Sequence, residues 1–124
     1  MQPEQVILHK KSRQLELVFQ GKSYRLDAEY LRVLSTSAEV RGHGDQSGSL
    51  PHGKASVAID RLEPAGNYAL KIIFDDGHDT GIYTWDYLYD LCQHREGYWQ
   101  DYLEQLHKEG KSREPDTQVV KLLQ

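Results

Sequence analysis

Polar side chains that could do chemistry are concentrated in one stretch of the sequence, residues 31–44, which is LRVLSTSAEVRGHG. This stretch combines arginines, a carboxylate, hydroxyls and a histidine directly after a short amphipathic segment. Such side chains form either a polar pocket that recognises a partner or a hydrogen-bonded network that anchors a loop, and arginine suits both roles. The candidate interaction or polar site comprises residues of this stretch and a tryptophan from a later aromatic segment: Arg32, Ser35, Ser37, Glu39, Arg41, His43 and Trp85.

Histidines provide a second chemical possibility, a metal site. His78 follows a turn, and His43 and His52 lie in a glycine-rich segment, with Asp45 and Asp79 as further candidates. Histidine and carboxylate ligands suit a divalent metal such as iron or zinc. Because these residues do not have the spacing of a local ligand pair, we expect no cofactor. Metal binding through His78 with His43 or His52 stays open as the alternative.

The single cysteine, Cys92, excludes an intramolecular disulfide and a cysteine-based metal cage built by one chain. It lies on an apolar helical stripe, where a thiol packs as a small hydrophobic side chain. The sequence also shows no nucleophile spaced from a base, no phosphate-binding glycine loop and no recognisable acid–base pair of carboxylates. Catalysis by this chain on its own is therefore the less favoured class of function.

The composition indicates one globular domain. The chain has 124 residues, of which 38% are hydrophobic, and a formal net charge of -4; this length is enough for one compact core. Its 15 lysines and arginines are scattered rather than clustered, which argues against nucleic acid as a partner. The sequence has no apolar run long enough for a membrane span and no signal sequence, so we expect no membrane partner and a cytoplasmic monomer or weak dimer.

The N-terminal third has the two-residue hydrophobic period of β-strands. The expected elements are a hairpin and one further strand: residues 15–19 and 24–26 around a turn at 20–22, and residues 6–9. Asp27 is expected to cap a short helix over residues 28–34, its carboxylate accepting hydrogen bonds from backbone amides. This helix brings Ser35 and the residues after it to a helix C-terminus.

The middle of the chain combines a long loop with further strands. Residues 39–55 are rich in glycine and show no hydrophobic period, as in a loop that is either functional or mobile. The strands expected after this loop are a short one at 57–59, a central one at 68–74 and, beyond a turn at 75–77, a return strand at 81–83. The central strand is apolar on both faces, which is typical of a strand covered on both sides.

The next segment is expected to be helical from Thr84, a suitable N-cap. Apolar residues recur there at the three- and four-residue steps of one buried helix face; they are Trp85, Leu88, Cys92, Trp99, Tyr102 and Leu106. Gly97 is expected to interrupt this helix. The sequence thus predicts a single α+β domain over residues 1–110, with a small, mostly antiparallel sheet, a short helix after the first hairpin and a longer C-terminal helical region packed on the sheet. A polar tail follows at 111–124.

Two stretches, LRVLSTSAEVRGHG at 31–44 and IFDDGHDTGIYTWDYLYDLC at 73–92, resemble the signature of the gamma-butyrobetaine hydroxylase-like N-terminal domain family. The similarity extends over about residues 6–105. It implies a small α+β domain that occurs free in bacteria, and elsewhere fused ahead of iron- and 2-oxoglutarate-dependent oxygenase domains or attached to iron–sulfur scaffold ATPases. In the oxygenase fusions, the resemblance implies, the partner domain carries the catalysis.

The resemblance also implies where a metal site would lie. In the eukaryotic hydroxylase this domain binds structural zinc through a Cys-x-Cys-x-x-Cys cluster and a distant histidine, whose positions correspond here to Ser35, Ser37, Val40 and His78. Valine cannot coordinate a metal and serine is a poor zinc ligand, so the zinc site is not carried over in that form. We instead expect the His78 imidazole to form a hydrogen bond with the 35–40 segment.

The leading functional hypothesis is a non-catalytic interaction or adaptor domain. The family's fusions link it, by analogy, to iron–sulfur cluster assembly or to an iron/2-oxoglutarate oxygenase-type partner. The dense aromatic residues between 83 and 102 are expected to supply core packing, and those left exposed would mark a protein-binding face. The alternative hypothesis is a metal-binding accessory protein that uses His78 with His43 or His52.

Overall fold

The structure is a computed structural model that describes residues 1–36 and 50–115. Several sequence-based expectations concern residues outside these ranges. They are those for Ser37, Glu39, Val40, Arg41, His43, Asp45 and the apolar residues near the C-terminus.

The N-terminal residues form a three-stranded antiparallel sheet with the strand order β1-β2-β3. Its strands are β1 (Gln5–His9), β2 (Gln14–Phe19) and β3 (Lys22–Asp27). In β2, Leu15, Leu17 and Phe19 are buried and alternate with partly exposed residues, as the two-residue period predicts. Gln20 and Gly21 connect β2 to β3 with φ angles of 51° and 77°, the left-handed values of a two-residue hairpin turn. The predicted hairpin and the additional strand are both confirmed.

A second three-stranded antiparallel sheet has the order β4-β5-β6. Its strands are β4 (Ile59–Ala65), β5 (Ala69–Phe74) and β6 (Gly81–Thr84). The central strand β5 is buried on both faces, as predicted, but it starts one residue later than expected because Tyr68 belongs to the preceding turn and is 64% exposed. The strand expected at 57–59 also starts later, because Val57 belongs to a turn in which its backbone amide donates a hydrogen bond to the Lys54 carbonyl.

The short helix α1 (Ala28–Val33) lies at the centre of the fold. Five of its residues are buried: Ala28, Glu29, Tyr30, Leu31 and Val33. Asp27 occupies the N-cap position as predicted, but the expected side-chain capping bond is absent. The Asp27 carboxylate accepts a hydrogen bond from Gln14 Nε2 at 2.9 Å instead, because the two residues are directly opposite each other in the β2–β3 pair.

The C-terminal helical region consists of α2 (Trp85–Gln93) and α3 (Arg95–Glu109). Thr84 caps α2 as predicted: its hydroxyl accepts from the Tyr87 amide at 3.1 Å. The expected interruption at Gly97 is wrong, because Gly97 lies within α3 and the break occurs at His94. Side chains meet across the break: Asp90 contacts the His94 ring at 2.9 Å and accepts a hydrogen bond from the Tyr98 hydroxyl at 2.8 Å. We call this break the α2–α3 corner.

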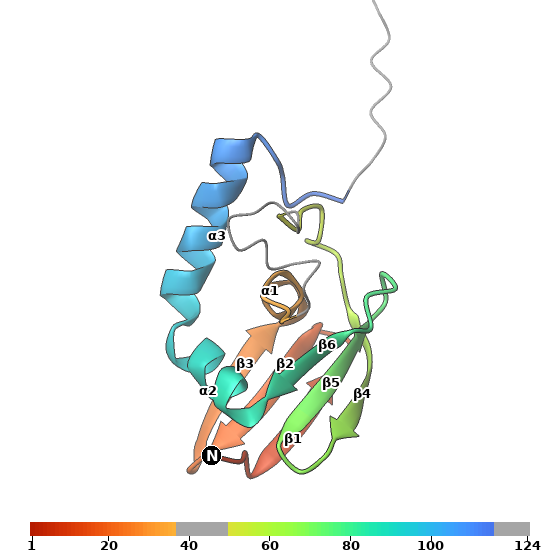
Figure 1. Cartoon of the computed structure of the whole chain (residues 1–124), viewed down its shortest axis with the longest axis vertical. Coiled ribbons are helices and arrows are strands. Elements are labelled where there is room, and N and C mark those ends of the chain that lie inside the picture. Colours follow the sequence, from red (N-terminus) through yellow and green to blue (C-terminus); the bar gives the residue numbers. More distant parts are fainter. Residues whose placement is uncertain (37–49, 116–124) are drawn as a thin grey trace, which may run out of the picture.

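The main hydrophobic core contains residues from both sheets, α1 and α2. A smaller cluster of Val33, Tyr102 and Leu106 packs α3 against α1. Figure 1 shows this arrangement: the strands occupy the lower half of the molecule, α1 lies above them, and α3 runs along one side. The predicted α+β class with antiparallel strands and C-terminal helices is confirmed, and the strands are divided between two sheets. Within the part of the chain that the structure describes, none of the helices has the length and apolar character needed to cross a bilayer.

The chain turns back on itself after α3. Gly110 ends the helix with a left-handed φ of 65°. The carbonyls of Ser112 and Arg113 then accept hydrogen bonds from the amides of Gly53 and Ala55, at 2.8 and 2.9 Å. Residues 111–115 therefore lie against the segment that precedes β4.

Candidate functional site

The C-terminal end of α1 meets the β5–β6 turn in a buried polar contact. Ser35 follows α1 and is 1% exposed, and His78 lies in the turn and is 7% exposed. The Ser35 hydroxyl and His78 Nε2 are hydrogen-bonded at 2.9 Å. This is the hydrogen bond that we expected between the imidazole and the 35–40 segment. We call this contact and the residues bonded to it the α1 junction.

Gly81 makes room for this contact. A Cβ atom built on Gly81 would lie 2.8 Å from the Ser35 hydroxyl and 3.0 Å from the Tyr83 ring. Any larger residue at the start of β6 would therefore push Ser35 or Tyr83 out of place. The glycine is a packing requirement of the α1 junction.

The Asp76 carboxylate holds the turn beside α1. Its Oδ2 accepts from Arg32 Nε at 2.9 Å and from Lys54 Nζ at 2.6 Å, and its Oδ1 accepts from the His78 amide at 3.1 Å. Burial alone would raise the pKa of Asp76, but the hydrogen bonds from Lys54 and the His78 amide and the nearby Arg32 charge together lower it to about 2. The carboxylate is therefore ionised at neutral pH and fixes His78 opposite Ser35.

Arg32, a predicted site residue, belongs to this network. Its side chain is 11% exposed, and its Nε is bonded to Asp76. Its Nη1 is buried and has no hydrogen-bond partner within the described residues. Arg32 thus acts here as an ion-pair partner that joins α1 to the β5–β6 turn.

Tyrosine hydroxyls satisfy the carbonyl groups at the end of α1. Helix C-termini leave carbonyls without intrahelical donors. The Tyr83 hydroxyl donates to the Leu31 carbonyl, and the Tyr87 hydroxyl donates to the Leu34 carbonyl at 2.7 Å. The two rings stack, with centroids 6.1 Å apart, and burial raises the pKa of Tyr83. Sequence reasoning had assigned these tyrosines only to packing or to an exposed face.

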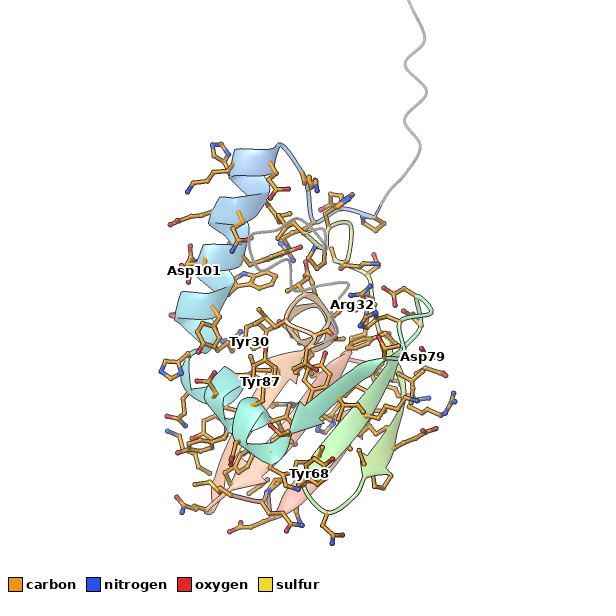
Figure 2. All side chains as sticks on the ribbon, viewed as in Figure 1. Tyr30, Arg32, Tyr68, Asp79, Tyr87 and Asp101 are labelled. Carbon is orange, nitrogen blue, oxygen red and sulfur yellow. The ribbon has the colours of Figure 1, made fainter. Side chains whose placement is uncertain are left out.

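Trp85, another predicted site residue, lies elsewhere. It follows the end of β6 remote from His78, and its indole Nε1 donates to the Asn67 carbonyl in the β4–β5 turn at 2.9 Å. Figure 2 shows the separation, with Tyr68 of that turn at the lower end of the molecule and Arg32 beside α1. Of the predicted site residues that the structure describes, it brings together Arg32, Ser35 and His78 but not Trp85.

The described residues do not assemble a metal site. His52 is exposed. Within residues 1–36 and 50–115, no group of three or more His, Cys, Asp or Glu side chains could hold a metal ion. His43 and Asp45 lie outside the described residues. Cys92 is buried in the main core, and burial raises the pKa of its thiol to about 12.

A second region, which the sequence did not indicate, is a groove along α3. It consists of two adjoining pockets that share Arg95 and Glu96. The larger pocket, of about 620 Å³, lies between β3 and the α2–α3 corner. The smaller pocket, of about 240 Å³, lies between the start of α1, the first half of α3, and Arg113. We call the two together the α3 groove.

The larger pocket contains the free edge of β3. Because a two-residue turn connects β2 and β3, Lys22, Tyr24 and Leu26 form the hydrogen-bonded pairs with β2. The backbone groups of Ser23 and Arg25 consequently point away from β2. Of the backbone hydrogen bonds made outside helices and sheets by the described residues, none involves Ser23 or Arg25. Arg25 therefore presents an unused backbone edge to the groove.

The smaller pocket contains an ion pair between a buried carboxylate and a half-exposed arginine. Glu29 in the first turn of α1 has an 8% exposed side chain, and its two oxygens accept from Arg113 Nε and Nη2, each at 2.8 Å. The Arg113 guanidinium also lies 5.3 Å from the centre of the Trp99 ring. Sequence reasoning missed this pair because Glu29 and Arg113 are 84 positions apart and no local pattern relates them.

These features define a small α+β domain with two three-stranded antiparallel sheets and two C-terminal helices, joined by a buried polar junction and bordered by a groove. The sequence model described as "Gamma-butyrobetaine hydroxylase-like, N-terminal" matches residues 6–89. The chain therefore belongs to the gamma-butyrobetaine hydroxylase-like N-terminal domain family.

Solved structures of similar proteins agree with this assignment. One solution NMR structure is 52% identical to the chain with a TM-score of 0.81, and covers 99% of this chain and 98% of its own. A second NMR structure is 45% identical with a TM-score of 0.77, and covers 98% and 93%. A crystal structure of a protein of unknown function from Acidithiobacillus ferrooxidans, described as a member of the DUF971 family, is 34% identical with a TM-score of 0.58, and covers 73% and 91%. No curated protein matches the chain.

The zinc site that the resemblance implies does not fit the residues present. Of its four positions the structure describes two, Ser35 and His78. Their hydroxyl and the ring nitrogen Nε2 bond each other directly at 2.9 Å. A neutral hydroxyl is also a poor substitute for a thiolate. In this chain a hydrogen bond joins the two segments.

Proposed function

We propose that this protein is a non-catalytic interaction domain of the cytoplasm that binds a protein partner in the α3 groove. The observation that carries this proposal is that two pockets adjoin along α3. The two pockets share Arg95 and Glu96 and extend from the free edge of β3 to Arg113. Adjoining pockets that offer backbone groups, aromatic rings and both signs of charge suit an extended polypeptide segment.

The β3 edge supports this mode of binding. An extended peptide can pair with an unused strand edge through main-chain hydrogen bonds, while pockets beside the edge select its side chains. The two edges of the other sheet, β4 and β6, are less suited to such pairing. The β6 carbonyl of Ile82 accepts a hydrogen bond from Thr36, and β4 contains Pro64 and an irregularity between Ile59 and Arg61.

The α1 junction supports a structural role for the polar residues outside the groove. Asp76, His78 and Ser35 bond one another or neighbouring segments, and the Ser35–His78 bond is buried. Their contribution to function would be indirect, because they hold α1 in position and α1 forms one wall of the smaller pocket. The family's fusion partners suggest the partner classes to test first, which are iron–sulfur assembly proteins and iron/2-oxoglutarate oxygenases.

The test is an NMR titration of the isotopically labelled full chain with purified members of these two classes. We expect the largest amide shifts at Arg25, Arg95 and Glu96. The double variant Arg95→Ala/Glu96→Ala should weaken binding about tenfold or more, as removal of central contacts does in other interfaces. The matched control is Arg61→Ala/Glu63→Ala, which removes an exposed arginine–glutamate pair from β4. Equal affinities for the two double variants, or shifts confined to residues outside the groove, would contradict the proposal.

A further inference from the structure

The smaller pocket of the α3 groove is built around a guanidinium group. Glu29 is a carboxylate on the buried helix α1, and a buried carboxylate needs a paired cation to offset its desolvation. The bond pattern is bidentate, since each carboxylate oxygen accepts from a different nitrogen of Arg113 at 2.8 Å. This geometry matches the planar fork of a guanidinium and not the single point charge of an ammonium.

An aromatic ring completes the recognition of this group. The Arg113 guanidinium carbon lies 5.3 Å from the centre of the Trp99 ring, within the range of a cation–π contact. Trp99 is itself held by neighbouring rings, because its centroid is 6.3 Å from that of Tyr30 and 5.3 Å from that of Tyr102. Tyr30 and Tyr102 are anchored in turn by hydrogen bonds from their hydroxyls to the carbonyls of Leu91 and Pro51. The Trp99 ring is therefore held in place by contacts that do not involve Arg113.

Arg113 is held less firmly than the pocket it enters. It lies beyond the end of α3, in a segment attached through the backbone bonds of Ser112 and Arg113 to Gly53 and Ala55. Its side chain is 44% exposed, whereas that of Glu29 is 8% exposed. A guanidinium supplied from outside could therefore replace Arg113 without disturbing the helices that form the pocket.

The charges of the pocket favour such a replacement by another cation. With Arg113 in place, the pocket is lined by the carboxylates of Asp27, Glu29 and Glu96 and by two arginines, Arg95 and Arg113. When Arg113 leaves, three carboxylates face one arginine. The cavity of about 240 Å³ beside Arg113 also leaves space for an entering side chain.

We propose that the Glu29–Trp99 pocket is a guanidinium-binding site, which Arg113 fills in the free protein and an arginine side chain of the bound protein partner fills in its place. This inference rests on the proposed function, and it names the chemistry by which the partner is recognised at one end of the α3 groove. Arg113 then acts as an internal ligand that the partner must displace.

The pocket can be tested without a partner by using methylguanidinium as the probe. In Arg113→Ala, the probe should shift the Trp99 indole and Glu29 amide NMR signals with a saturable Kd on the order of 1–10 mM. In the wild-type chain the same concentrations should produce at most about a tenth of the occupancy, because Arg113 fills the site. Methylammonium, which has the charge but lacks the fork, should bind Arg113→Ala at least about fivefold more weakly. If Arg113→Ala is unfolded, the readout becomes refolding, which methylguanidinium should promote and methylammonium should not.

Two results would refute the proposal that this pocket binds a guanidinium group. One is that methylguanidinium leaves Arg113→Ala unchanged; the other is that it binds Glu29→Gln/Arg113→Ala with the same affinity. The displacement step has its own test once a partner is in hand. Arg113→Ala should bind the partner several-fold more tightly than the wild-type chain, whereas Glu29→Gln should bind it more weakly. Weaker binding by Arg113→Ala would show that Arg113 is a direct contact and would refute displacement.

The same experiments separate this inference from the proposed function. If methylguanidinium fails to bind but Arg95→Ala/Glu96→Ala still weakens partner binding, the groove is an interface without a guanidinium site and the inference fails alone. If methylguanidinium binds but no partner contacts the groove, the proposed function fails, and with it the displacement by a partner arginine.

Discussion

The Asp76 carboxylate accepts hydrogen bonds from Arg32, Lys54 and the His78 amide, so one side chain joins α1, the segment before β4 and the β5–β6 turn. Its pKa of about 2 lies below its ordinary value of 3.8 despite the opposing effect of burial. A carboxyl group whose pKa is lowered by folding stabilises the folded state above the unfolded-state pKa. This contribution is complete above about pH 4 to 5 and is lost as the pH falls through 2.

We therefore expect Asp76→Asn to reduce stability at pH 7 by about 1–2 kcal/mol, after allowance for partial solvent screening of the group. The wild-type chain should lose the corresponding increment between about pH 5 and pH 2, and Asp76→Asn should lose less over the same interval. Urea unfolding followed by circular dichroism at several pH values measures both effects. Asp101→Asn, which removes an exposed carboxylate of α3, is the matched control and should change neither quantity (Figure 2).

His78 supplies the second prediction at this scale. His78→Ala removes a buried hydrogen bond to Ser35, and we expect it to lower the free energy of unfolding by about 1–3 kcal/mol. Thermal unfolding with and without added zinc decides whether the loss is structural. We expect zinc to leave the unfolding temperatures of both proteins unchanged. Zinc-dependent stabilisation of the wild-type chain that disappears in His78→Ala would instead favour the metal-binding alternative through His78 with His43 or His52.

At the scale of elements, local patterns were sufficient for some features and insufficient for others. The hairpin around Gly21 and the Thr84 cap depend on residues adjacent in sequence, and both were predicted correctly. The α2–α3 corner was misplaced at Gly97 because glycine has only a weak local effect on helix propensity, and Gly97 lies inside α3 while the break falls at His94. Asp27 is a similar case: its carboxylate accepts a hydrogen bond from Gln14, which lies opposite it in the sheet, and does not cap the helix.

Alanine substitutions at Gly97 and Gly81 should change the free energy of unfolding in opposite directions. Gly97 lies on the exposed side of α3, and a Cβ built on it meets nothing within 4 Å. Gly97→Ala should therefore raise the free energy of unfolding by about 0.5 kcal/mol through helix propensity. Gly81→Ala places a Cβ 2.8 Å from the Ser35 hydroxyl and should lower it by about 1–3 kcal/mol. Equal changes in urea midpoint for the two variants would contradict the packing assigned to Gly81.

For the whole molecule, the fold class could be predicted because periodic apolar residues form both the strands and the C-terminal helices. The contacts between segments that are distant in the sequence could not be predicted in this way. The Ser35–His78 contact was expected only because of the family resemblance, and the α3 groove was not expected at all. The groove is bordered by β3, α1, α3 and Arg113, and the residues that meet there carry no common motif. Ordinary residue types become a site only through tertiary contacts.

The last prediction concerns how residues 111–115 are attached to the rest of the chain. Arg113→Ala leaves Glu29 buried without its cation, and we expect a loss of about 2 kcal/mol, less than for a fully buried pair because the Arg113 side chain is 44% exposed. Glu29→Gln/Arg113→Ala should recover about 1 kcal/mol of this loss, since a neutral amide is less costly to bury than an unpaired carboxylate. Urea unfolding of the wild-type chain, both single variants and the double variant gives the coupling energy directly. Additive losses in the double variant would mean that the Arg113 segment is held by its backbone bonds to Gly53 and Ala55 and not by the ion pair.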